Sequence, residues 1–143
     1  MKWITRKYAK VDRIACPWLI KNIIDKDAEF LFVSPEEVLA ITDKEKAISY
    51  DAPSAQFTHT DDDKCTFEVL IDHYKIEDKA MHHLAKVVHG ADIPKDISLT
   101  PESAGLRTIA DGFRIICKDD YENMAKQFAV YDALYAYFQV MDK

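Results

Sequence analysis

The feature of this sequence that most constrains its fold is a change of pattern about halfway along its 143 residues. Up to about residue 50, short apolar runs of strand length at residues 3–4, 29–33 and 47–50 alternate with two helical segments. Such alternation usually builds a parallel sheet with right-handed crossovers. From about residue 65 onward, apolar residues recur only at helical spacing. We therefore predict a mostly helical α/β fold, in which a small three-stranded, mainly parallel sheet in the N-terminal third precedes an all-helical C-terminal half. The two parts are expected to pack as a single domain over residues 1–143.

The helical half shows several amphipathic stripes separated by clear start and stop signals. The second helix is expected to end near Gly90, because a glycine is common just beyond a helix C-terminus. The third has an apolar stripe that includes Ile109 and Ile116. Gly105 and Gly112 lie seven residues apart on the same helix, which would permit close approach by a neighbouring element. Ordinary helix packing is the favoured explanation of the two glycines.

Charge and composition exclude several classes of function. The formal net charge is −6, and sequence-independent binding of nucleic acid needs a basic face. We therefore expect no direct nucleic-acid binding. No apolar run approaches the roughly 18 residues of a membrane span, so no membrane association is expected. The three cysteines form an odd set without framework spacing, which is typical of reduced thiols in the cytoplasm.

A polar segment just before the first helix contains the first group of candidate functional residues. Pro17 suits the first turn of a helix, which places Cys16 at or just before the N-cap. Free N–H groups and the helix dipole would favour a thiolate there. One interpretation is that Cys16 is partly accessible and lines a polar pocket with Arg6, Asp12 and Arg13, which would bind a small tetrahedral anion. The other is that Cys16 is a buried apolar residue and Asp12 only caps the helix.

A second group of candidates consists of residues that could bind a metal ion. Residues 51–64 form an aperiodic loop of a length that is more often functional than not, and His59 lies within it. Glu68 falls in the first turn of the following helix, and His89 and Asp92 are three residues apart near a helix end. One or two imidazoles with two carboxylates suit zinc, iron or manganese better than calcium. Each of these residues also has an ordinary structural explanation at a helix end.

Several segments spread over nearly the whole chain resemble those of a known family. They include WITR, KVDRIACPWLI, FTH, CTFE, GAD, AGL and VYDALYA, beginning at residues 3, 10, 57, 65, 90, 104 and 130. These segments are similar to the chromate-resistance protein family, in the domain that forms the C-terminal part of ChrB-type proteins. The resemblance implies a role connected with resistance to chromate or oxidants. Longer members of the family carry an additional N-terminal region that this sequence does not include.

Three classes of function remain open. The first is a metal-binding protein or metal-dependent enzyme that uses His59, Glu68, His89 and Asp92. The second is a redox or oxyanion-handling protein centred on the Cys16 thiol, and the third is a regulatory interaction domain without catalysis. The sequence has no glycine-rich phosphate loop, nucleophile elbow or CxxC motif that would define a reaction. A small anion or a metal ion is the expected ligand, and a homo-oligomer is compatible with every class.

Overall fold

Three parallel strands form the sheet of the computed structural model, which describes residues 1–142. The strand order is β2-β1-β3, with β1 at Lys2–Arg6, β2 at Glu29–Val33 and β3 at Ile48–Ser49. The central strand pairs along its whole length with β2 and over two residues with β3. This arrangement confirms the small parallel sheet predicted for the N-terminal third.

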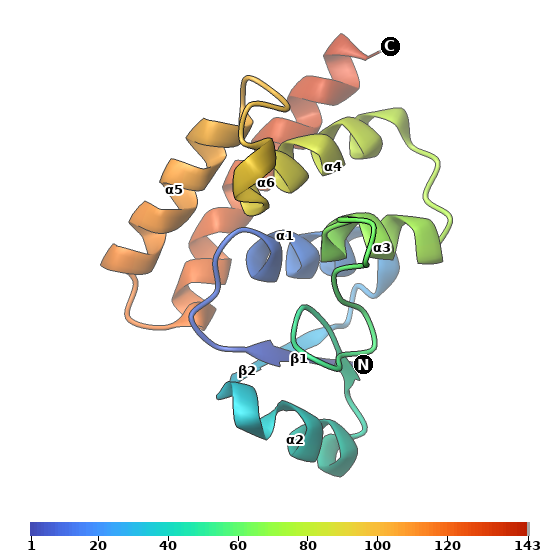
Figure 1. Cartoon of the computed structure of the whole chain (residues 1–143), viewed down its shortest axis with the longest axis vertical. Helices are drawn as coiled ribbons and strands as arrows, with labels where there is room; N and C mark the ends of the chain where they lie inside the picture. The colour runs from blue at the N-terminus through green and yellow to red at the C-terminus, as the bar shows by residue number, and fades with distance from the viewer. Residues whose placement is uncertain (143) are drawn as a thin grey trace.

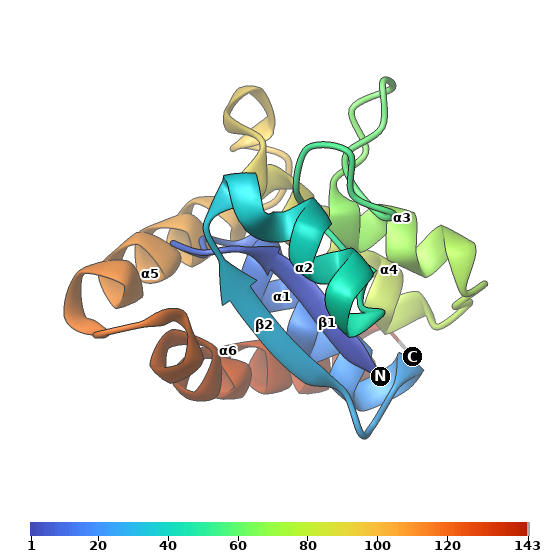
Figure 2. The same ribbon diagram turned by 90° about the horizontal axis from the view of Figure 1, so that it is seen from below.

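Each face of the sheet packs against different elements, and Figure 2 shows α1 on one side of it and α2 on the other. Side chains along a strand alternate between the two faces. Ile4 therefore faces α2 (Val38–Glu45), where it forms a small apolar cluster with Val38. Trp3, its neighbour on β1, belongs instead to the main core on the opposite face.

The first helix begins earlier than its proline suggests. Helix α1 spans Asp12–Leu19, so Pro17 lies inside it and Cys16 is in its second turn, which corrects the expected start at Cys16. A proline there removes one backbone hydrogen bond of the helix. The chain continues as a π-helical turn at Ile20–Ile24, with bonds that span five residues.

The C-terminal half is helical, as predicted. Its helices are α3 (Thr66–His73), α4 (Lys79–Asp92), α5 (Ser103–Ile116) and α6 (Asp120–Met141), with a 3₁₀ turn at Pro94–Asp96. Helix α4 packs against α3, α5 and α6, and α6 also packs against α1 (Figure 1). The indole N–H of Trp18 donates to Asp132 at 2.8 Å and so connects α1 to α6. The strands and the helices thus share one main apolar core.

The three glycines do not have the roles that the sequence predicts for them. Helix α4 continues past Gly90, and a Cβ atom there would lie 2.3 Å from the Ser103 hydroxyl. Gly90 is therefore the position of close approach, where α5 begins against α4. Gly105 and Gly112 have nothing within 4 Å of an added Cβ, and Ile109 on the same helix is 42% exposed. Among residues 1–142, no helix is both long and apolar enough to cross a membrane.

Candidate functional site

Polar residues gather at the carboxyl edge of the parallel sheet. Arg6 is the last residue of β1, and Asp51 lies two residues beyond β3. The Arg6 side chain donates from Nε to the Asp51 backbone oxygen at 3.1 Å. In parallel α/β sheets, ligands generally bind beyond the carboxyl ends of the strands. The topology therefore brings these residues to the usual position of a functional site.

Asp12 connects the start of α1 to the start of α3. Its carboxylate is 1% exposed and accepts the backbone N–H groups of Thr66 at 2.8 Å and Phe67 at 3.1 Å. These N–H groups belong to the first turn of α3, where a helix has no internal acceptors for them. The Thr66 hydroxyl also donates to Asp51 at 2.7 Å. Two buried carboxylates are thus fixed in orientation by one helix N-terminus.

One imidazole nitrogen lies among three carboxylates. His59 Nε2 is 3.2 Å from an oxygen of Asp51 and 3.2 Å from an oxygen of Asp92, in the last turn of α4. The same nitrogen is 3.4 Å from Asp12. We refer to Asp12, Asp51, His59 and Asp92 as the His59 cluster. Its carboxylates are mostly buried, whereas the His59 side chain is 42% exposed, so the cluster is open to solvent on the His59 side.

The charges within the His59 cluster shift its protonation equilibria. The carboxylates of Asp12, Asp51 and Asp92, all close to Nε2, stabilise the imidazolium and raise the pKa of His59 to about 12. Burial, together with the charges of Asp92 and Asp51, raises the pKa of Asp12 to about 7. Burial alone would raise the pKa of Asp51, but hydrogen bonds from His59 and Thr66 hold it below its usual value. The cluster therefore holds a proton on His59 more strongly than an imidazole in water does.

The residues predicted to surround Cys16 do lie together, but the thiol is not accessible. Arg13 Nη1 is 3.9 Å from an Asp51 oxygen, and Cys16 Sγ is 3.4 Å from Asp12. Cys16 is 0% exposed, because it lies in the second turn of α1 and not at its N-terminus. Burial, followed by the charges of Asp12 and Asp51, raises the pKa of the Cys16 thiol well above its usual value. The expectation of a partly accessible thiolate is thus wrong.

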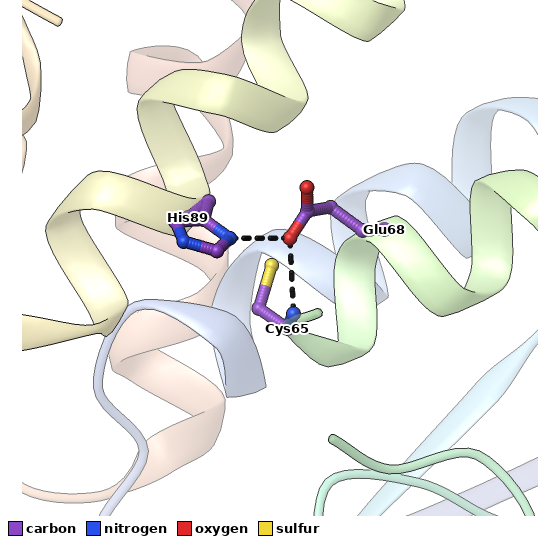
Figure 3. Close-up of side chains that lie close together, drawn as sticks. All are labelled: Cys65, Glu68 and His89. Atoms are coloured by element: carbon purple, nitrogen blue, oxygen red, sulfur yellow. Dashed lines mark hydrogen bonds and ion pairs between the residues drawn. The ribbon is translucent and has the colours of Figure 1, made fainter. Parts of the chain in front are cut away.

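Glu68 and His89 form a second cluster, shown in Figure 3 together with Cys65. His89 Nδ1 is 2.5 Å from a Glu68 oxygen, and His89 Nε2 is 2.7 Å from an oxygen of Asp96. The Glu68 carboxylate also accepts the backbone N–H of Cys65 at 3.0 Å. We refer to Cys65, Glu68, His89 and Asp96 as the His89 cluster. Burial tends to lower the pKa of His89, but its hydrogen bonds to Glu68 and Asp96 raise it above its usual value.

The structure therefore divides the four predicted metal ligands into two pairs. His59 and Asp92 meet in one cluster, and Glu68 and His89 meet in the other. In each cluster three side chains offer ligand atoms within 4.8 Å of one another; they are Asp12, His59 and Asp92 in the first, and Cys65, Glu68 and His89 in the second.

Sequence reasoning missed Asp51, Cys65 and Asp96 as members of these clusters. Asp51 lies two residues after the third strand, and the rule that sites lie beyond the carboxyl ends of parallel strands could have identified it. Cys65 occupies an N-cap, where Ser, Thr, Asp or Asn is preferred. An unusual residue at that position was the available signal.

A large cavity lies apart from both clusters. Its volume is about 690 Å³, and it is formed by the segment after β1, the turn between α5 and α6, and neighbouring side chains. Its lining includes Lys7, Phe32, Arg114, Cys117 and Tyr121, and no residue of either cluster. Acidic and basic side chains both line it. The concentration of ligand atoms, and not the size of the void, identifies the candidate site.

The fold and the site together define a small α/β protein with a carboxylate–imidazole cluster at the carboxyl edge of a three-stranded parallel sheet. The family model for the ChrB C-terminal domain matches residues 3–138, and the chain belongs to that family.

One curated relative is Protein ChrB of Cupriavidus metallidurans (strain ATCC 43123 / DSM 2839 / NBRC 102507 / CH34). The two sequences are 34% identical over 140 residues, which is 96% of this chain but 40% of the relative. The chain thus spans about two fifths of the length of that protein. No solved structure matches this chain.

Proposed function

We propose that this chain binds a divalent metal ion at the His59 cluster and acts in chromate resistance. The proposed ligands are the imidazole of His59 and the carboxylates of Asp12, Asp51 and Asp92. The observation that supports this proposal is the convergence of three carboxylates on a single imidazole nitrogen. The family resemblance supports the biological context.

A proton on His59 satisfies this arrangement only in part. The Nε2 atom has at most one hydrogen to donate, whereas three carboxylates lie within 3.4 Å of it. Three carboxylates brought together raise one another's proton affinity unless a cation lies between them. A metal ion with two positive charges would offset more of that repulsion than one proton does.

The spacing of the carboxylate oxygens from His59 Nε2 also suits a shared metal ion, and the ligand atoms of Asp12, His59 and Asp92 all lie within 4.8 Å of one another. With bonds of about 2.1 Å, neighbouring ligand atoms are roughly 3.0 Å apart around an octahedral ion and roughly 3.4 Å apart around a tetrahedral one. The distances from His59 Nε2 to its three neighbours are 3.2–3.4 Å. The N–H groups of Thr66 and Phe67 hold Asp12 in place, which is how metal ligands are usually oriented by their own partners.

The donor set limits the choice of ion and of ligand. One imidazole with several carboxylates is typical of manganese, iron or zinc sites. A site with an open position would hold water, which the ion makes more acidic and so available for hydrolytic or redox work. Arg6 and Arg13 both contact Asp51, and guanidinium groups bind tetrahedral oxyanions well. A small oxyanion such as chromate is therefore the proposed class of ligand beside the metal.

Metal content tests this proposal directly. By mass spectrometry, the wild type purified without chelator should hold about one equivalent of manganese, iron or zinc that depends on the His59 cluster, in addition to any metal bound elsewhere on the chain. The variants His59→Asn and Asp92→Asn should each lose it. His83→Asn is the matched control, because His83 also pairs with an aspartate (Asp142 at 2.8 Å) but lies outside the cluster. Equal metal in all four proteins, at any stoichiometry, would contradict the proposal.

A further inference from the structure

We propose that the His89 cluster is a second metal site of different chemistry, which takes a thiol-binding divalent ion such as Zn²⁺. Its ligands are the Cys65 thiolate, the Glu68 carboxylate and His89 Nδ1. This proposal does not depend on metal binding at the His59 cluster, because the two share no ligand.

The three ligand atoms already converge. The Cys65 sulfur, a Glu68 oxygen and a His89 nitrogen all lie within 4.8 Å of one another. Figure 3 shows the three side chains directed toward a common point between α3 and α4. Cys65 is buried, whereas the Glu68 side chain is 26% exposed, so an ion can enter from the Glu68 side.

The orientation of His89 is the second observation that points to a metal. A histidine that ligates a metal with one ring nitrogen almost always donates the other N–H to a carboxylate, a backbone carbonyl or water. His89 has this arrangement: Nδ1 faces Glu68 and Cys65, and Nε2 is 2.7 Å from an Asp96 oxygen. Asp96 would thus be a positioning residue that fixes the ring and selects the nitrogen that binds the ion.

The residue type at position 65 also favours a ligand over a cap. A Ser, Thr, Asp or Asn at this N-cap would bond the first-turn N–H groups better than a thiol does. Those of Thr66 and Phe67 are bonded instead by Asp12, which comes from α1. The Cys65 side chain faces the remaining first-turn N–H, that of Glu68, in a capping box, and the Glu68 carboxylate accepts the Cys65 N–H in return. A hydroxyl would accept that N–H better than a thiol does, so capping alone does not account for a cysteine here. A thiolate with an imidazole and a carboxylate is a zinc-type donor set, with a fourth position left for water or an anion.

The two clusters are neighbours in the structure, and they favour different metal ions. His89 and Asp92 lie three residues apart in the last turn of α4, and Cys65 directly precedes the residue that donates to Asp12. Positions three apart on a helix have Cβ atoms about 5–6 Å apart. The oxygen-rich His59 cluster favours a harder ion, and the sulfur-containing His89 cluster favours a softer one.

Cobalt spectroscopy of the 143-residue chain tests the second site. Chelator-treated protein is titrated with Co²⁺, because a thiolate bound to Co²⁺ gives a charge-transfer band in the near ultraviolet. The wild type and Cys117→Ser should show this band at one cobalt per chain, and Cys65→Ser should lack it. His59→Asn should keep the band while losing any cobalt bound at the other cluster. If cobalt binds only at the His89 cluster, this result contradicts the function proposed for the His59 cluster and leaves the second site supported.

A second variant leaves the buried Cys65 unchanged, so it carries less risk of disturbing the fold. Glu68→Gln keeps an oxygen that can accept the Cys65 N–H, so α3 retains its first turn, but it removes the charged ligand. We expect it to fold and to bind Co²⁺ at least tenfold more weakly, with the band retained at saturating metal. Absence of the band in the wild type would overturn the proposal. A band that survives in Cys65→Ser and disappears in Cys16→Ser would also overturn it, since the thiolate would then be Cys16.

Discussion

At His59, protons and metal ions compete for the same carboxylates. The imidazole pKa is raised to about 12 and that of Asp12 to about 7, so both groups can hold a proton near pH 6. A metal ion binds the deprotonated forms and must release those protons. Metal affinity at the His59 cluster should therefore fall as the pH falls.

This competition predicts a specific pH dependence. Below about pH 7 the ion displaces protons from both His59 and Asp12, so the logarithm of the apparent affinity should rise by about two per pH unit. Above about pH 7 only the His59 proton remains, and the slope should fall to about one. Calorimetry of Mn²⁺ binding in buffers with different ionisation enthalpies counts the protons released. The absence of any proton release at pH 6 would contradict the assignment of His59 as a ligand.

The cysteines should differ in reactivity. Cys16 and Cys65 are 0% exposed and burial raises both pKa values, whereas Cys117 lies at the partly exposed C-terminal end of α5. Cys117 alone should react with a thiol reagent in the native, metal-free protein, and the other two should react only on unfolding. The control, Cys117→Ser, should show no native-state reaction. Two fast-reacting thiols in the wild type would mean that a buried cluster opens readily.

At the scale of the helices, Gly90 is the position where α4 and α5 approach most closely. A Cβ atom there would lie 2.3 Å from the Ser103 hydroxyl, 2.8 Å from its Cβ and 2.9 Å from the Asp96 backbone oxygen. Gly90→Ala should lower the free energy of unfolding by about 1–3 kcal/mol, because the backbone must shift to make room. Urea denaturation measures this change.

The other two glycines of the chain serve as matched controls. Gly105 and Gly112 are also helical but have nothing within 4 Å of an added Cβ. Alanine at either position should leave stability unchanged or raise it by up to about 1 kcal/mol, because alanine favours the helix over glycine. Equal destabilisation at all three positions would show that contact with Ser103 is not the cause.

Sequence patterns predicted the type of each element better than its contacts. The strands and helices follow from hydrophobic periodicity, which depends on local spacing alone. The start of α1 was misplaced because a proline was assigned to the first turn, whereas the helix contains Pro17 and continues into a π-helical turn. A local rule cannot include the packing that holds this helix against its neighbours.

Some residues of the candidate site, but not their grouping, were predicted from the sequence. His59, Glu68, His89 and Asp92 all contribute to polar clusters, yet they belong to two clusters and not one. His89 and Asp92 are about 60° apart around α4, so each meets a different partner. Which partner that is depends on where α3 crosses α4, and this crossing is set by the core rather than by the spacing of the ligands.

At the scale of the whole molecule, the His59 cluster connects segments that are distant along the chain. Its ligands come from the start of α1, the loop after β3 and the end of α4, so they span residues 12 to 92. A ligand that binds only when these segments are assembled stabilises the folded state by mass action. Metal binding should therefore be coupled to global unfolding and not only to the order of one loop.

That coupling predicts a thermal shift of known size. With free Mn²⁺ or Zn²⁺ at 100 times its dissociation constant, the folded state gains about 2.7 kcal/mol. For a chain of this length each kcal/mol raises Tm by about 3 °C, so the shift should be about 8 °C and should be reversed by chelator. His59→Asn should abolish the shift produced by Mn²⁺, the ion that the oxygen-rich cluster favours, while His83→Asn should retain it. An unchanged Tm on addition of either ion to the wild type, or an equal shift in His59→Asn and wild type with Mn²⁺, would show that the three carboxylates converge on His59 to bind its proton alone.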